Sequence, residues 1–577
     1  MSQAMTMSGT LESKKTSARP ELDQAVAAVR AKADEFARLP VRARVALLRE
    51  VIPRIVAEGP AWVAAGCQAK GIPQGTPLAG EEWLAGVSIT VRTARLLAES
   101  LESIAERGKP SFGTKVRVRA DGRIEADVFP ASTFDQLLFG GIRSHILFRK
   151  GLSLSQLRDL QASFYSRKDP EGRVALVLGA GNVSSIPATD VLDKMFVQGQ
   201  VCVLKVNPVN EWVGPFLERA FAPLVQRGYL RFAYGAGDVG AYLVGHTDID
   251  EVHITGSDKT HDLIVWGPPG PDRDRRKAAH DPLLKKKITS ELGNVSPVMI
   301  VPGQYSDEQL WFQARSVATM VTNNASFNCN AGKILVTSKG WPQRERFLDL
   351  LQKALGSAPL RKAYYPGAFE RYADLTSGRQ VIKVGTPSGD QLPWTLIPDV
   401  DSSRSDEKLF VTEPFCAIIS ATTLSSSDPA AFLAEATRFC NTRLWGTLNA
   451  AITLPRELEK DPAIARALDQ AIVDLEYGNV AINHWPALCY GLVTPSWGGH
   501  PKATLEDVQS GIGFIHNTFM LEGIEKSVVR GPLVASPKPA WFYDNKKTHE
   551  IGEKLVRFNA APSWWKVPGL AVSALGG

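Results

Sequence analysis

The sequence predicts an α/β fold built from two doubly wound parallel sheets. Short apolar segments alternate with helical segments along residues 174–256, which is the order of a parallel sheet with crossover helices. A second set of apolar segments follows between residues 297 and 483. At 577 residues the chain is also longer than one hydrophobic core usually serves. We therefore expect two lobes, each with its own sheet.

Eight apolar segments are the expected strands of these sheets. In the first lobe they begin at Val174, Val201, Leu230 and Glu251, and in the second at Pro297, Ile334, Phe415 and Gly478. Before the first sheet, apolar residues recur at helical spacing over residues 22–36, 42–57 and 84–106. The chain therefore opens with amphipathic helices and then alternates strands with helices.

Residues 116–129 change from the helical period to strict alternation. The segment VRVRADGRIEADVF alternates apolar and polar residues around Asp121-Gly122, which is the signal of a tight hairpin turn. We therefore expect a projecting β-hairpin between the opening helices and the first sheet. Such a ribbon exposes strand edges that a partner subunit could cover.

The composition is typical of a soluble globular enzyme. Hydrophobic residues make up 44% of the chain and charged residues 22%, and 66 basic against 60 acidic residues leave no charge block of the kind that binds nucleic acid. The polar N-terminus lacks the apolar core of a signal peptide, and no stretch reaches the roughly 18 apolar residues of a membrane span. We expect neither a nucleic-acid nor a membrane partner.

Cysteine use argues against a disulfide framework and against a metal site. The six cysteines share no C-x-x-C or metal-ligand spacing. Sparse, unpatterned cysteines are typical of a reducing compartment, so we expect a cytoplasmic protein without a bound metal.

A glycine pair after the first strand invites comparison with the dinucleotide-binding fingerprint. Gly179 and Gly181 could let the backbone approach a phosphate. However, Ser184 stands at the third glycine position, and the second strand ends in KVNP without an acid to hold a ribose. A tight turn explains the glycines equally well, so they do not by themselves predict a nucleotide site.

A longer segment, GAGDVGAYLVGHTDIDEVHITGS at 235–257, resembles the aldehyde dehydrogenase segment in which a G-D-x-x-G-x-x-L helix precedes a strand ending in T-G-S. Five further segments resemble family motifs in the family's order: GAGNVSSIP (179–187), VCVLKVNP (201–208), SELGNVSP (290–297), NASFNCNAGK (324–333) and TEPFCAII (412–419). The resemblance covers roughly residues 20–530, and six ordered motifs are far less expected by chance than any one.

The resemblance implies a set of catalytic residues and a dinucleotide site. Cys329 would be the nucleophile, Glu291 the general base, and Asn182 the amide that helps form the oxyanion hole. The implied contacts to NAD or NADP are Lys205 at the adenosine ribose, Thr255, Gly256 and Ser257 at the pyrophosphate, and Glu413 and Phe415 at the nicotinamide ribose and ring.

These residues imply oxidation of a small-molecule aldehyde to a carboxylic acid through a Cys329 thioester that water hydrolyses. Two alternatives stay open. Coenzyme A instead of water could accept the acyl group, or the chain could be a non-catalytic protein with a dehydrogenase fold. Taken singly, each residue has a structural explanation as well, since a lone cysteine is usually a buried apolar residue.

The resemblance also implies a division of the chain and a homodimer or homotetramer. After a flexible tail (1–20) we expect a cofactor-binding domain (21–285), interrupted by a hairpin and oligomerisation insertion (112–168). A catalytic domain (286–495) and a C-terminal return segment with an extension (496–577) follow.

Three departures from the family pattern concern the cofactor. His261 stands where a glycine is usual, and Pro208 stands where members that prefer NAD carry a glutamate, so selectivity between NAD and NADP stays open. Residues 267–287 are rich in proline, glycine and basic side chains and predict an exposed loop, which could contact a 2′-phosphate or coenzyme A.

Overall fold

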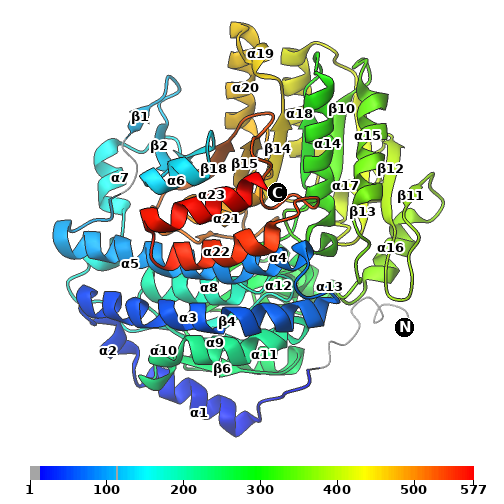
Figure 1. The fold of residues 1–577 in the computed structure, drawn as a ribbon. Coiled ribbons are helices and arrows are strands. Elements are labelled where there is room, and N and C mark those ends of the chain that lie inside the picture. Colours follow the sequence, from blue (N-terminus) through cyan, green and yellow to red (C-terminus); the bar gives the residue numbers. More distant parts are fainter. Residues whose placement is uncertain (1–12, 112–114) are drawn as a thin grey trace.

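The structure is a computed structural model that describes residues 13–111 and 115–577 (Figure 1). Residues 1–12 of the predicted flexible tail and residues 112–114 of the predicted hairpin insertion lie outside these ranges. The described chain forms two sheets of five and eleven strands and a two-stranded ribbon. The α/β fold predicted from the sequence is confirmed.

The smaller sheet lies in the first lobe and is entirely parallel, in the order β6-β5-β4-β7-β8. Its strands are β4 (Val174–Leu178), β5 (Val201–Lys205), β6 (Leu230–Ala233), β7 (Glu251–Gly256) and β8 (Lys287–Leu292). The helices between them are α8 (Ile186–Phe196), α9 (Gly214–Ala220), α10 (Ala222–Gln226), α11 (Gly237–Gly245), α12 (Asp258–Trp266) and α13 (Pro271–Ala278). The four predicted strands of this lobe are present.

Long N-terminal helices pack beside this lobe (Figure 1). They are α1 (Arg19–Arg30), α2 (Ala33–Ala37), α3 (Val41–Lys70), the short α4 (Gly80–Glu82) and α5 (Ile89–Arg107). Their buried apolar faces share one core with β4 and β5, as the helical spacing predicts. In the described part of the chain, no helix is long and apolar enough to cross a membrane.

The larger sheet runs in the order β1-β2-β3-β18-β15-β14-β9-β10-β13-β12-β11, parallel from β18 to β12 and antiparallel towards both edges. Its central strands are β9 (Pro297–Ile300), β10 (Ile334–Ser338), β11 (Ile382–Val384), β12 (Trp394–Val400), β13 (Ile418–Leu424), β14 (Asn449–Thr453), β15 (Asn479–Ile482) and β18 (Ile524–Arg530). The helices are α14 (Asp307–Thr322), α15 (Arg344–Ser357), α16 (Ala368–Thr376), α17 (Lys408–Val411), α18 (Pro429–Arg443), α19 (Arg456–Glu459), α20 (Pro462–Asp474) and α21 (Ala487–Gly491).

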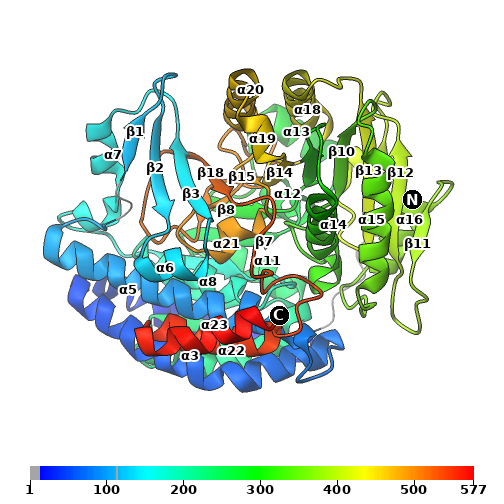
Figure 2. The same ribbon diagram turned by 45° about the horizontal axis from the view of Figure 1, so that its top comes forward.

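The predicted hairpin is present and continues the larger sheet. Strand β1 (Val116–Val118) pairs antiparallel with β2 (Ile124–Phe129), and Gly122 in the turn has a φ of 82°. Strand β3 (Arg143–Phe148) then joins β2 to β18, with α6 (Thr133–Leu138) and α7 (Leu154–Leu160) alongside. Figure 2 shows the hairpin rising beside the parallel strands. The ribbon is therefore hydrogen-bonded to the sheet of the second lobe through β18.

Two segments differ from the sequence prediction. The strand expected from Phe415 begins only at Ile418, because Phe415 has a φ of 42°, which is incompatible with an extended strand. Residues 267–287 are not wholly a loop, since they contain α13, which has no buried residue. Acidic residues in its first turn and basic residues in its last turn complement the helix dipole, which the sequence analysis overlooked.

The C-terminal extension folds back over the opening helices. Helix α22 (Thr548–Ala560) packs on the segment between α4 and α5, where Gly552 lies against Trp83 so closely that a Cβ would be 2.5 Å from the Trp83 Cβ. Helix α23 (Val567–Leu575) follows it along the same face (Figure 2). Strands β16 (Trp497–Gly498) and β17 (Phe514–Ile515) form the small ribbon that precedes this return.

Candidate active site

Cys329 lies in a strained loop that follows α14. The helix ends at Thr322, and the next turn contains Asn324, Ala325 and Ser326, whose φ angles are 51°, 56° and 70°. Residues other than glycine adopt this left-handed conformation at an energetic cost, and such strain persists at functional sites where surrounding contacts hold it. The segment that leads to Cys329 is therefore fixed by its neighbours.

Hydrogen bonds from the second lobe hold the backbone at Cys329. Its carbonyl accepts from Ser296 Oγ at 3.3 Å and from Asn449 Nδ2 at 3.2 Å. The next carbonyl, that of Asn330, accepts from the Trp485 indole at 2.6 Å. These side chains come from the start of β9, from β14 and from the loop after β15, so three parts of the lobe orient the thiol.

Glu291 lies in β8, beside the Cys329 thiol. The residue is 2% exposed, and among the described residues its Oε1 has no hydrogen-bond partner. Burial raises the pKa of Glu291 to about 8, the charges of Asp190 and Glu413 act in the same direction, and the neighbouring Cys329 and Trp497 offset this only in part. A carboxyl with this pKa can gain and lose a proton near neutral pH, as a general base must.

The Cys329 thiol is surrounded by carboxyl groups. Burial raises its pKa, and the charges of Glu291 and Glu413 raise it further, whereas the charge of Lys333 lowers it. The other five cysteines are buried, and Cys329 is the cysteine of intermediate exposure. Cys329 is therefore the thiol best placed to meet a substrate. Its surroundings favour the protonated thiol, so its ionisation needs positive charge nearby.

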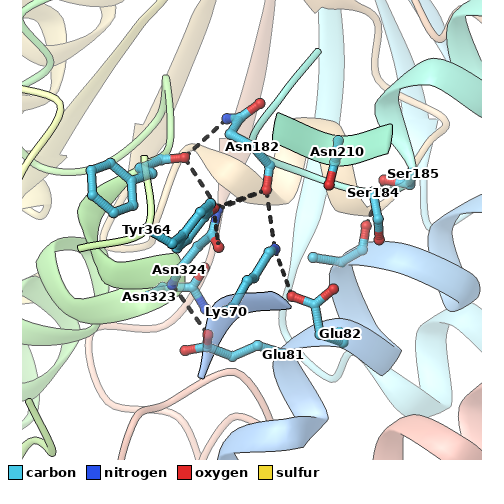
Figure 3. A network of polar contacts seen from close by, with 12 residues as sticks. Lys70, Glu81, Glu82, Asn182, Ser184, Ser185, Asn210, Asn323, Asn324 and Tyr364 are labelled. Carbon is cyan, nitrogen blue, oxygen red and sulfur yellow. Dashed lines mark hydrogen bonds and ion pairs between the residues drawn. The ribbon is translucent and has the colours of Figure 1, made fainter. Parts of the chain in front are cut away.

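Asn182 lies in the loop between β4 and α8 and reaches the nucleophile loop. Its side-chain Nδ2 donates to the Phe327 carbonyl at 3.0 Å. Its backbone carbonyl accepts from Lys70 Nζ at 3.1 Å, Asn324 Nδ2 at 3.1 Å and the Tyr364 hydroxyl at 3.2 Å, which converge on it in Figure 3. Since an amide nitrogen carries two N–H groups, the second can serve an oxyanion.

A buried ion pair supports this arrangement from the N-terminal helices. Lys70 Nζ, at the end of α3, lies 2.6 Å from Glu82 Oε1, and both side chains are at most 5% exposed. The neighbouring Glu81 carboxylate accepts from the Asn324 backbone N–H at 3.2 Å and from Arg361 at 2.9 Å. The opening helices thus hold both the Asn182 loop and the loop that leads to Cys329 (Figure 3).

Glu413 lies against the loop that follows Glu291. A Cβ on Gly293 would be 1.9 Å from Glu413 Oε2. The carboxylate can therefore lie at this position only because residue 293 has no side chain. Burial raises the pKa of Glu413 to about 7, while Lys333 and Arg371 lower it. Among the described residues its Oε1 has no hydrogen-bond partner. A buried acceptor of this kind fits the hydroxyls of a nicotinamide ribose.

Phe415 is held in a strained conformation beside the nucleophile loop. Its φ is 42°, and Arg371 of α16 donates to the Phe415 carbonyl at 3.1 Å and to the Pro414 carbonyl at 3.2 Å. The Phe415 ring packs against Phe327 at 5.7 Å and Tyr365 at 5.0 Å between centroids. Glu413 and Phe415 therefore lie with Cys329, Glu291 and Asn182 in one site.

The remaining predicted residues lie along the carboxyl edge of the smaller sheet. Lys205 ends β5 and Thr255 and Gly256 end β7, on either side of β4. Burial lowers the pKa of Lys205 to about 8, although Asp238 and Glu211 act against this effect. An edge of this kind, with helix N-termini, is where parallel sheets bind nucleotides.

Two of these residues have roles within the protein itself. The Thr255 hydroxyl donates to the buried Asp190 carboxylate at 2.9 Å. The Ser257 hydroxyl accepts from the Thr260 backbone N–H at 3.2 Å and so caps α12. Backbone groups of Gly256 and Ser257, which are both exposed, remain at the N-terminus of α12, where an anionic pyrophosphate would meet the positive end of the helix dipole.

Sequence reasoning missed several residues of this site. They are Lys70, Asn324, Lys333, Tyr364, Tyr365, Arg371 and Trp497. A signal existed for Lys333, because a lysine four residues after Cys329 and directly before a buried apolar segment must have a charged or polar partner. Asn324 lies in the same motif as Cys329 but was given no role, and the others come from segments without a recognisable motif.

Comparisons with known proteins identify relatives of modest similarity. The chain is 24% identical over 352 residues to 2-aminomuconic semialdehyde dehydrogenase of Homo sapiens and 24% identical over 336 residues to peroxisomal aminoaldehyde dehydrogenase 1 of Pisum sativum. These matches cover 56% and 54% of this chain, but less than two thirds of the relatives, 65% and 60%. No family model matches the sequence.

Solved structures show the fold over almost the whole chain. The γ-glutamyl-γ-aminobutyraldehyde dehydrogenase of Burkholderia cenocepacia has a TM-score of 0.62 at 19% identity, covering 91% of this chain and 92% of the other. Aldehyde dehydrogenase 21 of Physcomitrella patens has a TM-score of 0.59 at 16% identity, and the match covers 91% of this chain and 94% of the other. The chain therefore has the fold of the aldehyde dehydrogenase superfamily, and the predicted resemblance to that superfamily is confirmed.

Proposed function

We propose that this protein oxidises a small-molecule aldehyde to a carboxylic acid with NAD or NADP. The two relatives named above are aldehyde dehydrogenases, and so are structural neighbours that cover about nine tenths of this chain. The position of Cys329, Glu291 and Asn182 in one site supports the same activity. The observation that carries the proposal is the hydrogen bond of the Asn182 amide to the Phe327 carbonyl, two residues before Cys329, which brings a free amide N–H to the loop of the only partly exposed thiol.

The described residues fit a dinucleotide. Glu413 Oε1, which accepts no hydrogen bond from the described residues, would bind the nicotinamide ribose, the exposed N-terminus of α12 would bind the pyrophosphate, and Lys205 would bind the adenosine ribose. Structural neighbours support either cofactor, since an indole-3-acetaldehyde dehydrogenase was solved with NAD⁺ and a glyceraldehyde-3-phosphate dehydrogenase of Bacillus halodurans with NADP. When bound, the nicotinamide accepts a hydride from the substrate carbon.

The first chemical step belongs to Cys329. Its sulfur attacks the aldehyde carbon as a thiolate, after the thiol has released its proton to solvent, so this step does not require Glu291. The second N–H of the Asn182 amide would stabilise the oxyanion of the thiohemiacetal. Asn182 can do so with little reorganisation, because its backbone carbonyl and its other N–H are already bound. Loss of hydride leaves an acyl thioester on Cys329.

Hydrolysis of the thioester belongs to Glu291. A carboxylate beside the sulfur can remove a proton from a water molecule that attacks the acyl carbon, and its raised pKa makes it a stronger base than an exposed glutamate. The carboxylic acid then leaves and the Cys329 thiol is restored. This assignment favours water over coenzyme A as the acyl acceptor.

Glu291→Gln separates the two acceptors. The variant keeps the shape of the side chain and loses the base, so acylation should continue while hydrolysis stalls. We expect a burst of about one reduced cofactor per site, followed by a slow rate. Intact-mass analysis should show the acyl group on Cys329.

Glu525→Gln is the matched control, because Glu525 is a buried carboxyl that pairs with Arg123 in the hairpin region. It should turn over normally without a burst. Wild-type turnover that requires coenzyme A and releases an acyl-CoA would overturn the hydrolytic proposal.

We also propose that the protein is a homodimer or homotetramer. Val116 and Val118 of the edge strand β1 are 41% and 57% exposed, which is unusual for an unpaired strand edge in a monomer. Light scattering at micromolar concentration that gives the monomer mass would contradict this.

A further inference from the structure

Lys333 is a fully buried lysine at the centre of the candidate site. It stands four residues after Cys329, immediately before β10, and its side chain is 0% exposed. Its Nζ lies 3.9 Å from Glu413 Oε1 and 5.4 Å from the centroid of the Phe415 ring. It donates one long hydrogen bond, of 3.4 Å, to the Ser326 carbonyl.

These contacts satisfy a buried ammonium poorly. An ammonium has three N–H donors, and burial without close partners is costly. Another buried lysine of this chain shows the difference: Lys526 donates to the carbonyls of Ile472 at 3.0 Å, Val473 at 2.9 Å and Leu475. A buried ammonium with so few partners can form a further ion pair with a negative charge that appears during the reaction.

We propose that Lys333 is a positioning residue that supplies the positive charge needed to ionise Cys329 and that holds Glu413 in place for the cofactor. The proposal rests on the function proposed above, in which Cys329 is the nucleophile. No covalent step is assigned to Lys333. It acts on the thiol and on the carboxylate through its charge.

The charges around the two groups give the direction of the effect. Glu291 and Glu413 both raise the pKa of Cys329, after burial, and Lys333 lowers it. The pKa of the Lys333 ammonium is lowered by burial and by the charge of Arg371. It is raised by Glu413, Cys416 and Cys329. Without Lys333, the thiolate would form beside two carboxyl groups with one cation fewer to balance them, so its formation should move to higher pH.

The test measures the ionisation of Cys329 without aldehyde or cofactor. The rate of alkylation by iodoacetamide, followed by mass spectrometry of the peptide that contains Cys329, reports the thiolate fraction as the pH is raised. We expect Lys333→Met to shift this profile upward by at least about 1 pH unit, the effect of removing an opposite charge from a nearby group. Lys333→Arg, which keeps the charge, should restore the profile towards that of the wild type.

Two controls separate charge from folding. Lys526→Met removes a buried lysine outside the site and should leave the profile unchanged even if it lowers the melting temperature. If Lys333→Met does not fold, Lys333→Gln keeps a hydrogen-bond donor for Ser326 and should show the same upward shift. A folded Lys333→Met or Lys333→Gln variant with the wild-type profile would overturn the proposal.

The outcome is independent of aldehyde oxidation. If the wild type oxidises no aldehyde but the profile shifts as expected, the proposed function fails while the role of Lys333 stands. If the wild type oxidises aldehydes and the profile does not shift, only the role of Lys333 fails.

Discussion

The Asn182 side chain of the first lobe donates to the Phe327 carbonyl of the second lobe at 3.0 Å. Phe327 is two residues before Cys329, and the same carbonyl also accepts from Asn324 at 3.1 Å. The proposed oxyanion donor and the loop that carries Cys329 are therefore connected directly. A change in the position of one lobe relative to the other would change the distance between the Cys329 thiol and the Asn182 amide.

Asn182→Ala should lower kcat/KM by about 100- to 1,000-fold, the usual cost of one oxyanion donor. Cofactor affinity, measured by fluorescence titration, should change little, because the amide contacts the nucleophile loop. The matched control is Asn559→Ala. It removes a buried amide of the C-terminal extension that donates a hydrogen bond to Ser88. Wild-type kcat/KM in Asn182→Ala would contradict the oxyanion role.

Tyr364→Phe should lower kcat about fivefold, the equivalent of ~1 kcal/mol for the hydrogen bonding of one hydroxyl proton. The Tyr364 hydroxyl shares that proton between the Asn182 carbonyl at 3.2 Å and Asn324 Oδ1 at 2.9 Å, so its loss loosens both groups without removing either. KM for the aldehyde should be unchanged. Tyr543→Phe loses a hydroxyl that contacts Ser357 outside the site and should keep the wild-type kcat. Equal losses in the two variants would indicate a general effect on stability.

The strands and the motif residues could be predicted because their signals are local. A buried parallel strand is a continuous apolar run, and all four predicted strands of the smaller sheet are present. Cys329 and Glu291 were predicted because each lies in a contiguous motif. The start of β13 was misplaced, because the apolar run includes Phe415, whose conformation depends on Arg371 more than forty residues earlier.

The groups that hold Asn182 could not be predicted from the sequence. Lys70 and Tyr364 lie 112 and 182 residues away from it along the chain. Nothing in their local sequence distinguishes them from a solvated lysine and a core tyrosine. Their role follows only from the packing of the opening helices against the loop that precedes Cys329.

The pH dependence of thioester hydrolysis should report Glu291. Burial raises its folded-state pKa to about 8, so the carboxyl is protonated and inactive as a base below that pH and ionises as the pH rises. Loss of the acyl group from Cys329, followed by intact mass in single turnovers, should therefore accelerate with pH and level off above about 8. Glu291→Gln should abolish this inflection. An inflection near the ordinary value of glutamate would show that the raised pKa is wrong.

Gly293→Ala should weaken cofactor binding, because its Cβ would be 1.9 Å from Glu413 Oε2 and would displace that carboxylate. We expect KM for the dinucleotide to rise about tenfold, the equivalent of ~1.4 kcal/mol. Gly240→Ala in α11 is the control, since its Cβ would meet Leu178 at an ordinary 3.9 Å. An unchanged KM in Gly293→Ala would argue against contact between Glu413 and the cofactor.

The basic segment 267–287 bears on the choice between NAD and NADP. Had its side chains been free, they could have favoured NADP. In the structure Arg273 donates to the Gly267 carbonyl, Lys277 pairs with Asp262, and Lys285 pairs with Asp281. Neutralising Arg275, which is paired with Asp272 on the exposed helix α13, should therefore leave the KM for NADP unchanged.

The groups near Lys205 should instead set the selectivity. Pro208 supplies no carboxylate to bind a ribose or to repel a 2′-phosphate, so we expect kcat/KM for NAD and NADP to differ modestly. A preference for NAD above about a thousandfold, roughly 4 kcal/mol, would contradict this. Glu211 would then be the acid to test, because it acts on Lys205 and its carboxylate accepts from the Ser13 hydroxyl at 2.6 Å and the Lys14 backbone N–H at 2.9 Å. Glu211→Gln should relax such a preference, whereas Lys205→Met should weaken both cofactors alike.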